Sequence, residues 1–243
     1  MIGVSSLCML DSTLEQVLET INDVFSSIEV ISEGNHTNLQ ILESYNYSVS
    51  FHAPFSDLNI GSLNKAILKE SLNQITETIE RAPRYNVKAI CIHPGHYSPL
   101  GMHFREAVHD LQVASLKYLA KKAEENGVFL GVENMPHFPI LCARTYEEIE
   151  RIIKEVDSPR VGFTFDVGHA HVSGNLTGFL QLKDFIEVVH LHDNYGDQDA
   201  HLALGDGTIP LEVIKNLHDK RLIIEVNTYE DALRSLEVLN NLI

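Results

Sequence analysis

Short apolar runs rich in β-branched residues alternate with longer amphipathic segments along the whole chain. The runs predict eight strands, at residues 2–7, 27–32, 47–52, 87–93, 128–133, 160–166, 186–192 and 222–226. Helical patterns separate the strands and are clearest at residues 63–82, 104–127 and 145–156. Ser12 with Glu15, and Thr145 with Glu148, have the spacing of a capping box, and Gly127 is a stop signal. The pattern therefore predicts a repeated strand–helix unit.

Eight such units in 243 residues match a (β/α)8 TIM barrel, which has a usual length of about 250 residues. A doubly wound sheet is the competing α/β architecture. It normally carries a glycine-rich phosphate loop after its first strand, and the corresponding segment, "SSLCMLDST", contains no glycine. No linker or low-complexity tract interrupts the pattern. We therefore predict one α/β domain, a single TIM barrel spanning residues 1–243.

The charge balance bears on possible partners. The chain has 34 acidic and 18 basic residues, for a formal net charge of −16. Such a field repels polyanions, and so it weighs against a nucleic-acid partner. It does not exclude one, because bound divalent cations change the charge of a site locally.

The cysteines and the apolar segments bear on location. Cys8, Cys91 and Cys142 are isolated and fit neither a disulfide framework nor a CxxC metal knuckle, which indicates a reduced, cytoplasmic setting. The first ten residues lack the basic start of a signal peptide. No apolar run reaches the ~18 residues needed to span a bilayer, so we expect no membrane association.

Six successive predicted strands finish with an acidic residue or a histidine: His52 in "SFHAP", His93 in "CIHPG", Glu133 in "GVENMP", Asp166 in "FTFDVGHAH", His190 and His192 in "VVHLHDN", and Glu225 in "IIEVN". In a closed barrel these ends converge on one mouth. Each residue taken singly is better explained as hydrogen-bonded structure or a solvated loop, but six strands that agree favour a metal site. A mixed His, Asp and Glu set suits Zn²⁺ or Mn²⁺, and the absence of thiolates weighs against a closed structural zinc site.

The motifs "HAPF", "HPG", "VEN", "DVGHAH", "HLHDN", "DAH…GDGTI" and "IIEVN" occur in this order between His52 and Glu225. In this the chain resembles the xylose isomerase-like TIM barrels, the superfamily that contains endonuclease IV and many sugar isomerases and epimerases. Seven ordered motifs make the resemblance specific for the superfamily and much less so for the substrate.

Similarity to endonuclease IV implies a cluster of three metal ions with nine ligands: His52, His93, Glu133, Asp166, His169, His190, Asp199, His201 and Glu225. The ligand of the seventh strand is the histidine three residues before an aspartate, which selects His190. His192 occupies a position where the endonuclease has asparagine. It remains the second choice, because strand alternation places both side chains on the inward face.

Similarity to the isomerases and epimerases implies a smaller core of Glu133, Asp166, His190 and Glu225 around one Mn²⁺-, Mg²⁺- or Co²⁺-like ion. Glu133 and Glu225 would flank the substrate, one removing a proton from the carbon next to a carbonyl and the other returning it. The ion would stabilise the negative charge that develops on oxygen. Phe55, His96 and Asn134 are the candidate substrate contacts.

The complete nine-ligand set favours phosphoester hydrolysis, but the loops after the first two strands, "CMLDST" and "SEGNHTN", contain no Lys or Arg to hold phosphates. We therefore favour a divalent-metal-dependent isomerase or epimerase with one to three bound ions. Its substrate would be a small sugar, sugar phosphate or related keto compound. An endonuclease IV-type zinc-dependent phosphodiesterase acting on abasic DNA is the first alternative, and a non-catalytic metal- or ligand-binding barrel is the second. The sequence leaves the substrate and the oligomeric state open.

Overall fold

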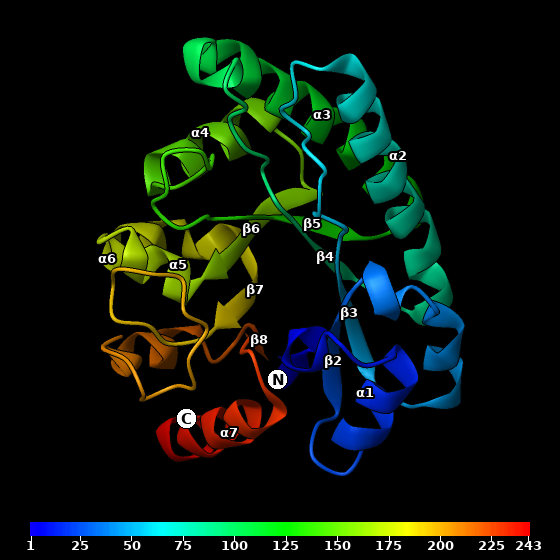
Figure 1. The fold of residues 1–243 in the computed structure, drawn as a ribbon, viewed down its shortest axis with the longest axis vertical. Coiled ribbons are helices and arrows are strands. Elements are labelled where there is room, and N and C mark those ends of the chain that lie inside the picture. Colours follow the sequence, from blue (N-terminus) through cyan, green and yellow to red (C-terminus); the bar gives the residue numbers. More distant parts are fainter.

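Eight parallel strands form the centre of the molecule in a computed structural model that describes residues 1–243. They are β1 (Ile2–Ser5), β2 (Ser27–Ile31), β3 (Ser48–His52), β4 (Ala89–Ile92), β5 (Phe129–Glu133), β6 (Val161–Asp166), β7 (Ile186–Leu191) and β8 (Arg221–Ile224). Each strand pairs with the next along the chain, and β8 pairs with β1 to close the barrel (Figure 1). This confirms the predicted TIM barrel, and each strand lies within two residues of its predicted bounds.

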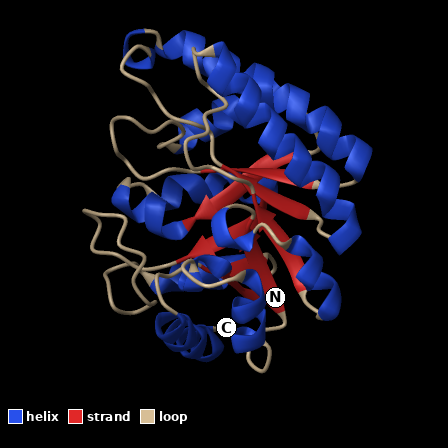
Figure 2. Ribbon diagram, turned by 45° about the vertical axis from the view of Figure 1, so that its right-hand side comes forward, coloured by secondary structure: helices blue, strands red, loops and turns tan.

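Helices surround the strands on the outside (Figure 2). The α-helices are α1 (Leu14–Ile21), α2 (Lys65–Arg81), α3 (Arg105–Asn126), α4 (Tyr146–Val156), α5 (Val167–Val172), α6 (Leu176–Phe179) and α7 (Tyr229–Leu242). Two crossovers lack an α-helix: η2 (Gly34–His36) and η3 (Leu39–Ser44) connect β2 to β3, and η7 (Leu211–Leu217) connects β7 to β8. The other 3-10 helices are η1 (Ser6–Met9), η4 (Ala82–Tyr85), η5 (Gly101–His103) and η6 (Leu180–Phe185). None of the helices combines the length and the apolar character needed to cross a bilayer.

The helix ends follow local capping chemistry. Helix α1 is capped by Thr13, so the prediction of a capping box at Ser12 was wrong by one residue. The Thr13 side chain accepts from the Gln16 N–H, and the Gln16 side chain accepts from the Thr13 N–H at 2.9 Å. Thr145 caps α4 as predicted, and Gly127 ends α3 with a φ of 67°, a left-handed conformation that glycine adopts without strain.

A core of 54 buried apolar residues joins the outer face of the barrel to the helices. The barrel interior is more polar. At the amino-terminal end of the strands, the Arg221 guanidinium donates to Ser27 Oγ at 3.1 Å and to Ser48 Oγ at 2.7 Å. This arrangement fills the bottom of the barrel, and the acidic and imidazole groups are gathered at the opposite end.

Candidate metal centre and active site

All nine predicted ligands, and His192 with them, meet at the carboxyl end of the barrel. Three of them are the last residues of their strands: His52 on β3, Glu133 on β5 and Asp166 on β6. The others lie one residue before a strand end, directly after a strand, in α5, or in the loop after β7: His190, His93, Glu225, His192, His169, Asp199 and His201. Parallel strands in a closed barrel therefore bring together residues that are more than 170 positions apart in the sequence.

Their ligand atoms form overlapping sets in which all atoms lie within 4.8 Å of one another. We call three of these sets the first cluster (His52, His93, Glu133), the central cluster (Glu133, Asp166, His190, Glu225) and the outer cluster (His169, His192, Asp199, His201). A further set joins Cys91 to Glu133 and His190. The donors are the imidazoles and carboxylates that suit Zn²⁺ or Mn²⁺, so the residues present fit the ions that the sequence implies.

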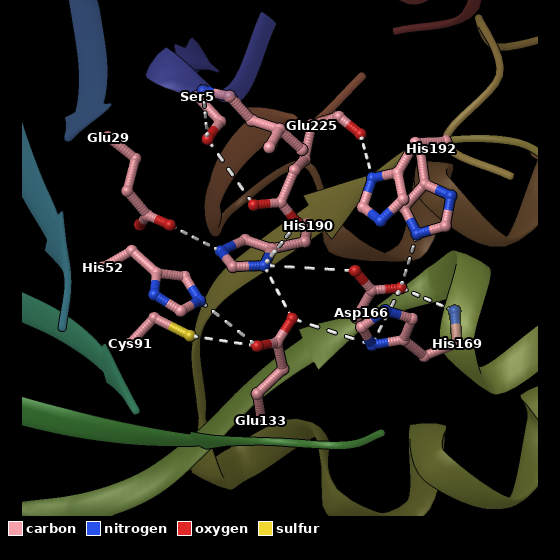
Figure 3. A network of polar contacts seen from close by, with 12 residues as sticks. Ser5, Glu29, His52, Cys91, Glu133, Asp166, His169, His190, His192 and Glu225 are labelled. Atoms are coloured by element: carbon pink, nitrogen blue, oxygen red, sulfur yellow. Dashed lines mark hydrogen bonds and ion pairs between the residues drawn. The ribbon is translucent and has the colours of Figure 1, made fainter. Parts of the chain in front are cut away.

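His190 lies in the middle of the central cluster (Figure 3). Its Nδ1 atom is 2.9 Å from Glu133 Oε1, 3.1 Å from Glu225 Oε2 and 4.0 Å from Asp166 Oδ2. Asp166 Oδ2 is buried and has no hydrogen-bond partner. Buried carboxylate oxygens without a donor are costly, and a cation among these groups would satisfy them.

Glu133 also belongs to the first cluster. Its second oxygen, Oε2, is 3.1 Å from His93 Nε2 and 3.5 Å from His52 Nε2. Its two oxygens face different sets of histidines, so Glu133 would help to hold an ion in the first cluster and an ion in the central cluster.

Two buried residues next to the central cluster were missed by the sequence analysis. Glu29, in the middle of β2, places Oε1 at 2.7 Å from His190 Nε2, at ion-pair distance but without hydrogen-bond alignment, and accepts from Ser50 Oγ at 3.0 Å. Cys91 Sγ lies 3.4 Å from Glu133 Oε2. Glu29 is the one charged residue in the apolar run 27–32, and this was the signal that could have marked it as part of the site. Because Nε2 of His190 faces Glu29, its Nδ1 is directed at the central cluster.

In the outer cluster, two histidines are oriented by backbone carbonyls. His169 Nδ1 is 2.7 Å from the carbonyl oxygen of Asn134, and His201 Nδ1 is 2.8 Å from that of Glu225. A carbonyl only accepts, so each Nδ1 carries a proton, and Nε2 is the ring atom left to bind a metal ion. Both Nε2 atoms point to Asp199 Oδ2, at 3.2 Å and 3.4 Å.

The electrostatics of the site favour ionised carboxylates. Burial alone would raise the pKa of Glu133 and of Glu225, but the adjacent His190 imidazole outweighs it. The pKa of Glu133 is held well below its ordinary value, and that of Glu225 is lowered to about 2. Burial opposes the charge of His201, yet the contact with Asp199 raises its pKa to about 9. The site thus favours positive charge, which is what a divalent cation would supply.

A cavity of about 180 Å³ opens directly over the clusters. Its apolar wall is formed by Leu7, Ile31, Phe55 and Met135, and its polar wall by ligands of all three clusters. No Lys or Arg lines it. A larger hollow of about 580 Å³ lies at the amino-terminal ends of β5 to β7, and it is lined by no histidine.

The three predicted substrate contacts have different environments. Phe55 lines the cavity and stacks on the His93 ring, with ring centroids 4.6 Å apart. His96 does not line the cavity. The Asn134 side chain is engaged with the backbone of Asp166, donating to its carbonyl at 2.9 Å and accepting from its N–H at 2.8 Å. Asn134 is fully buried, and both polar atoms of its amide bond to Asp166, so it positions a strand end.

Fold and site together define a TIM barrel with candidate metal-binding residues at the carboxyl end of its strands. A family model described as xylose isomerase-like TIM barrel matches residues 29–242, and the chain belongs to this family. This confirms the resemblance inferred from the ordered motifs.

Individual relatives extend the comparison. An uncharacterized protein of Methanocaldococcus jannaschii is 34% identical, over 98% of this chain and 87% of that protein. The crystal structure of a D-tagatose 3-epimerase-like protein superposes with a TM-score of 0.92 at 34% identity, covering 99% of this chain and 96% of that one. A probable endonuclease 4 of Malacoplasma penetrans is more distant, at 28% identity over 72% of this chain and 64% of its own length.

Proposed function

We propose that the protein is a divalent-metal-dependent isomerase or epimerase that acts on a small, unphosphorylated ketose or a related keto compound. The observation that carries the proposal is the cavity of about 180 Å³, which has Glu133 and Glu225 in its wall and no cationic side chain. Pockets for drug-sized ligands usually measure about 300–1,000 Å³, so this one suits a smaller molecule. A phosphate group needs cationic or backbone-amide partners, and the lining side chains include no cation.

Glu133 and Glu225 are the proposed catalytic residues. Both are held ionised, so either is ready to accept a proton from the carbon next to the carbonyl. The proton that goes back to the same or the adjacent carbon would come from the glutamate that has just accepted one, or from its partner after that partner takes a proton from solvent. An ion bound by the central cluster would act as a Lewis acid toward the substrate oxygens. His190 and Asp166 would hold that ion, and Phe55 would pack on the carbon skeleton of the sugar and exclude water.

The similarity to a D-tagatose 3-epimerase-like protein over nearly the whole chain supports this proposal. The experiment incubates the metal-loaded protein with a panel of ketoses in D₂O and follows deuterium uptake by mass spectrometry. We expect exchange at one carbon of at least one ketose, lost in Glu133→Gln and Glu225→Gln. Glu187→Gln, an exposed position on β7, is the matched control and keeps the activity. Absence of exchange in every ketose tested would overturn the proposal.

One observation favours a second candidate, a zinc-dependent phosphodiesterase of the endonuclease IV type. The complete first, central and outer clusters offer places for several ions, as the clamping of a phosphodiester requires. The cavity lining weighs against it, because it offers no side chain that would hold a DNA backbone. Metal-dependent nicking of a duplex with one abasic site would establish this activity, and an intact duplex at excess protein would eliminate it. A non-catalytic barrel predicts neither deuterium exchange nor nicking.

A further inference from the structure

His192 is fully buried, and neither of its ring nitrogens has a hydrogen-bond partner. Buried polar atoms are nearly always satisfied, and a neutral imidazole with two orphaned nitrogens pays the desolvation cost twice. The two other outer-cluster histidines each use Nδ1 on a carbonyl, so His192 is the exception in this cluster.

The ring of His192 packs closely against two neighbours. It stacks on His201 with centroids 4.0 Å apart and an angle of 17° between the rings. On another side it lies against Gly168 of α5, where an added Cβ would come within 2.0 Å of His192 Cε1. Only glycine leaves room for the ring at this position, so the backbone of α5 is shaped to accept a histidine here.

The distances from the three outer-cluster histidines to the Asp199 carboxylate are close to those between ligands of one ion. Two ligands bound at about 2.0–2.1 Å in a tetrahedral zinc site are about 3.3 Å apart. His192 Nε2 is 3.5 Å from Asp199 Oδ1, a buried atom that has no other partner. His169 and His201 lie at 3.2 Å and 3.4 Å from Asp199 Oδ2. A bound ion lies near the plane of each imidazole, so ligation requires the stacked rings of His192 and His201 to tilt toward a common point.

We propose that His192 is the fourth protein ligand of a closed metal site in the outer cluster. Three imidazoles and one carboxylate fill the four positions of a tetrahedral Zn²⁺-like ion and leave none for water or substrate. Thiolates are absent, but nitrogen and oxygen donors complete the coordination equally well. Such an ion has a structural function: it fastens Asp199 and His201, which lie in the loop after β7 and line the cavity, to β7 and α5. This proposal does not depend on the reaction assigned above.

The first test measures bound metal and thermal stability in His192→Asn, with the exposed His218→Asn as control. After dialysis of zinc-loaded protein against a weak chelator, we expect His192→Asn to retain about one equivalent per chain less than wild type and His218→Asn to lose none. Zinc should raise the melting temperature of His192→Asn less than that of wild type, each protein being compared with its own metal-free form. Full zinc retention by His192→Asn would overturn the proposal.

The second test reports the coordination directly and covers the case in which the asparagine variant folds poorly. Cobalt-loaded wild type should show the intense visible absorption of tetrahedral Co²⁺, weakened in His192→Asn as water enters the site. In His192→Cys, which supplies a thiolate at the same position, we expect a new near-ultraviolet thiolate-to-cobalt band beyond any band that Cys91 gives in wild type. Unchanged visible absorption in His192→Asn, or no new band in His192→Cys, would show that residue 192 is not a ligand.

Discussion

Glu29→Gln tests whether a buried charge outside the ligand set controls metal affinity. Glu29 lies in the middle of β2, fully buried, and its Oε1 atom is 2.7 Å from His190 Nε2. When His190 binds an ion through Nδ1, the proton stays on Nε2, and a neighbouring carboxylate makes the imidazole a stronger ligand. Glutamine keeps the volume and can keep a hydrogen bond to Ser50, so the substitution removes mainly the negative charge.

The size of the effect follows from the distance. Two unit charges 2.7 Å apart interact with about 6 kcal/mol at an effective dielectric constant of about 20. A metal-bound imidazole carries only a fraction of a unit charge, so the loss is smaller. Replacing such carboxylate partners of metal-binding histidines typically weakens metal affinity 10- to 100-fold, or about 1.4–2.7 kcal/mol. We expect Glu29→Gln to fall within this range.

The assay is competition between the protein and a coloured chelator of known affinity, fitted for successive ions. Glu187→Gln is the control, because it removes a carboxylate from an exposed position of β7, the strand that carries His190. The affinity for an ion in the outer cluster should change least, because Glu29 does not contact that cluster. Wild-type affinity in Glu29→Gln, with a normal fold by circular dichroism, would refute the idea that this charge supports His190.

Three further predictions concern stability and are measured by urea or thermal unfolding of the metal-free protein. Gly168→Ala drives a methyl group into the His192 ring, and such overpacking should lower the free energy of unfolding by about 1–3 kcal/mol; an unchanged melting curve would contradict the packing described here. Arg221→Met removes charged hydrogen bonds from the bottom of the barrel and should cost about 1.5–3 kcal/mol, while metal affinity, set at the opposite end, stays the same. Burial lowers the pKa of His36 below 6.5, so protonation favours the unfolded chain; wild type should lose stability relative to His36→Gln as the pH falls through 6.5, and parallel pH profiles would show otherwise.

The barrel was predictable because each strand is short, apolar and separated from the next by a helical pattern or a turn. The two crossovers without an α-helix were not, since the repeated strand–helix pattern predicts a helix in every crossover, whereas segments 34–44 and 211–217 contain only 3-10 helices. The start of α1 shows the same limit at one residue: Ser12 with Glu15 and Thr13 with Gln16 both have the spacing of a capping box, so the sequence does not distinguish them, and the structure has the second pair.

The gathering of the candidate ligands was predictable from their position at the strand ends, because the closed barrel brings all carboxyl ends of its strands together. The roles of His190 and His192 were not. Alternation along β7 directs both rings into the barrel, and the sequence left His190 and His192 as alternatives for one metal ligand. In the structure His190 Nδ1 faces Glu133 and Glu225 of the central cluster, while His192 Nε2 lies between Asp166 and Asp199. The difference arises from the loop after β7, which folds back over the barrel and places Asp199 and His201 next to the imidazole of His192.

Shared carboxylates link the three clusters and bear on which reaction they can serve. Glu133 faces the first and the central clusters with different oxygens, and Asp166 lies 3.2 Å from His192 as well as in the central cluster. A first ion neutralises part of the negative charge that attracts the next ion and repels it directly, so we expect successive ions to bind with decreasing affinity. If His192 closes the outer cluster, substrate can reach only the first and central clusters. A phosphodiesterase that needs three open ions would then lack one, whereas proton transfer between Glu133 and Glu225 requires only the central ion. The extra histidine thus favours a small keto substrate over a nucleic-acid backbone.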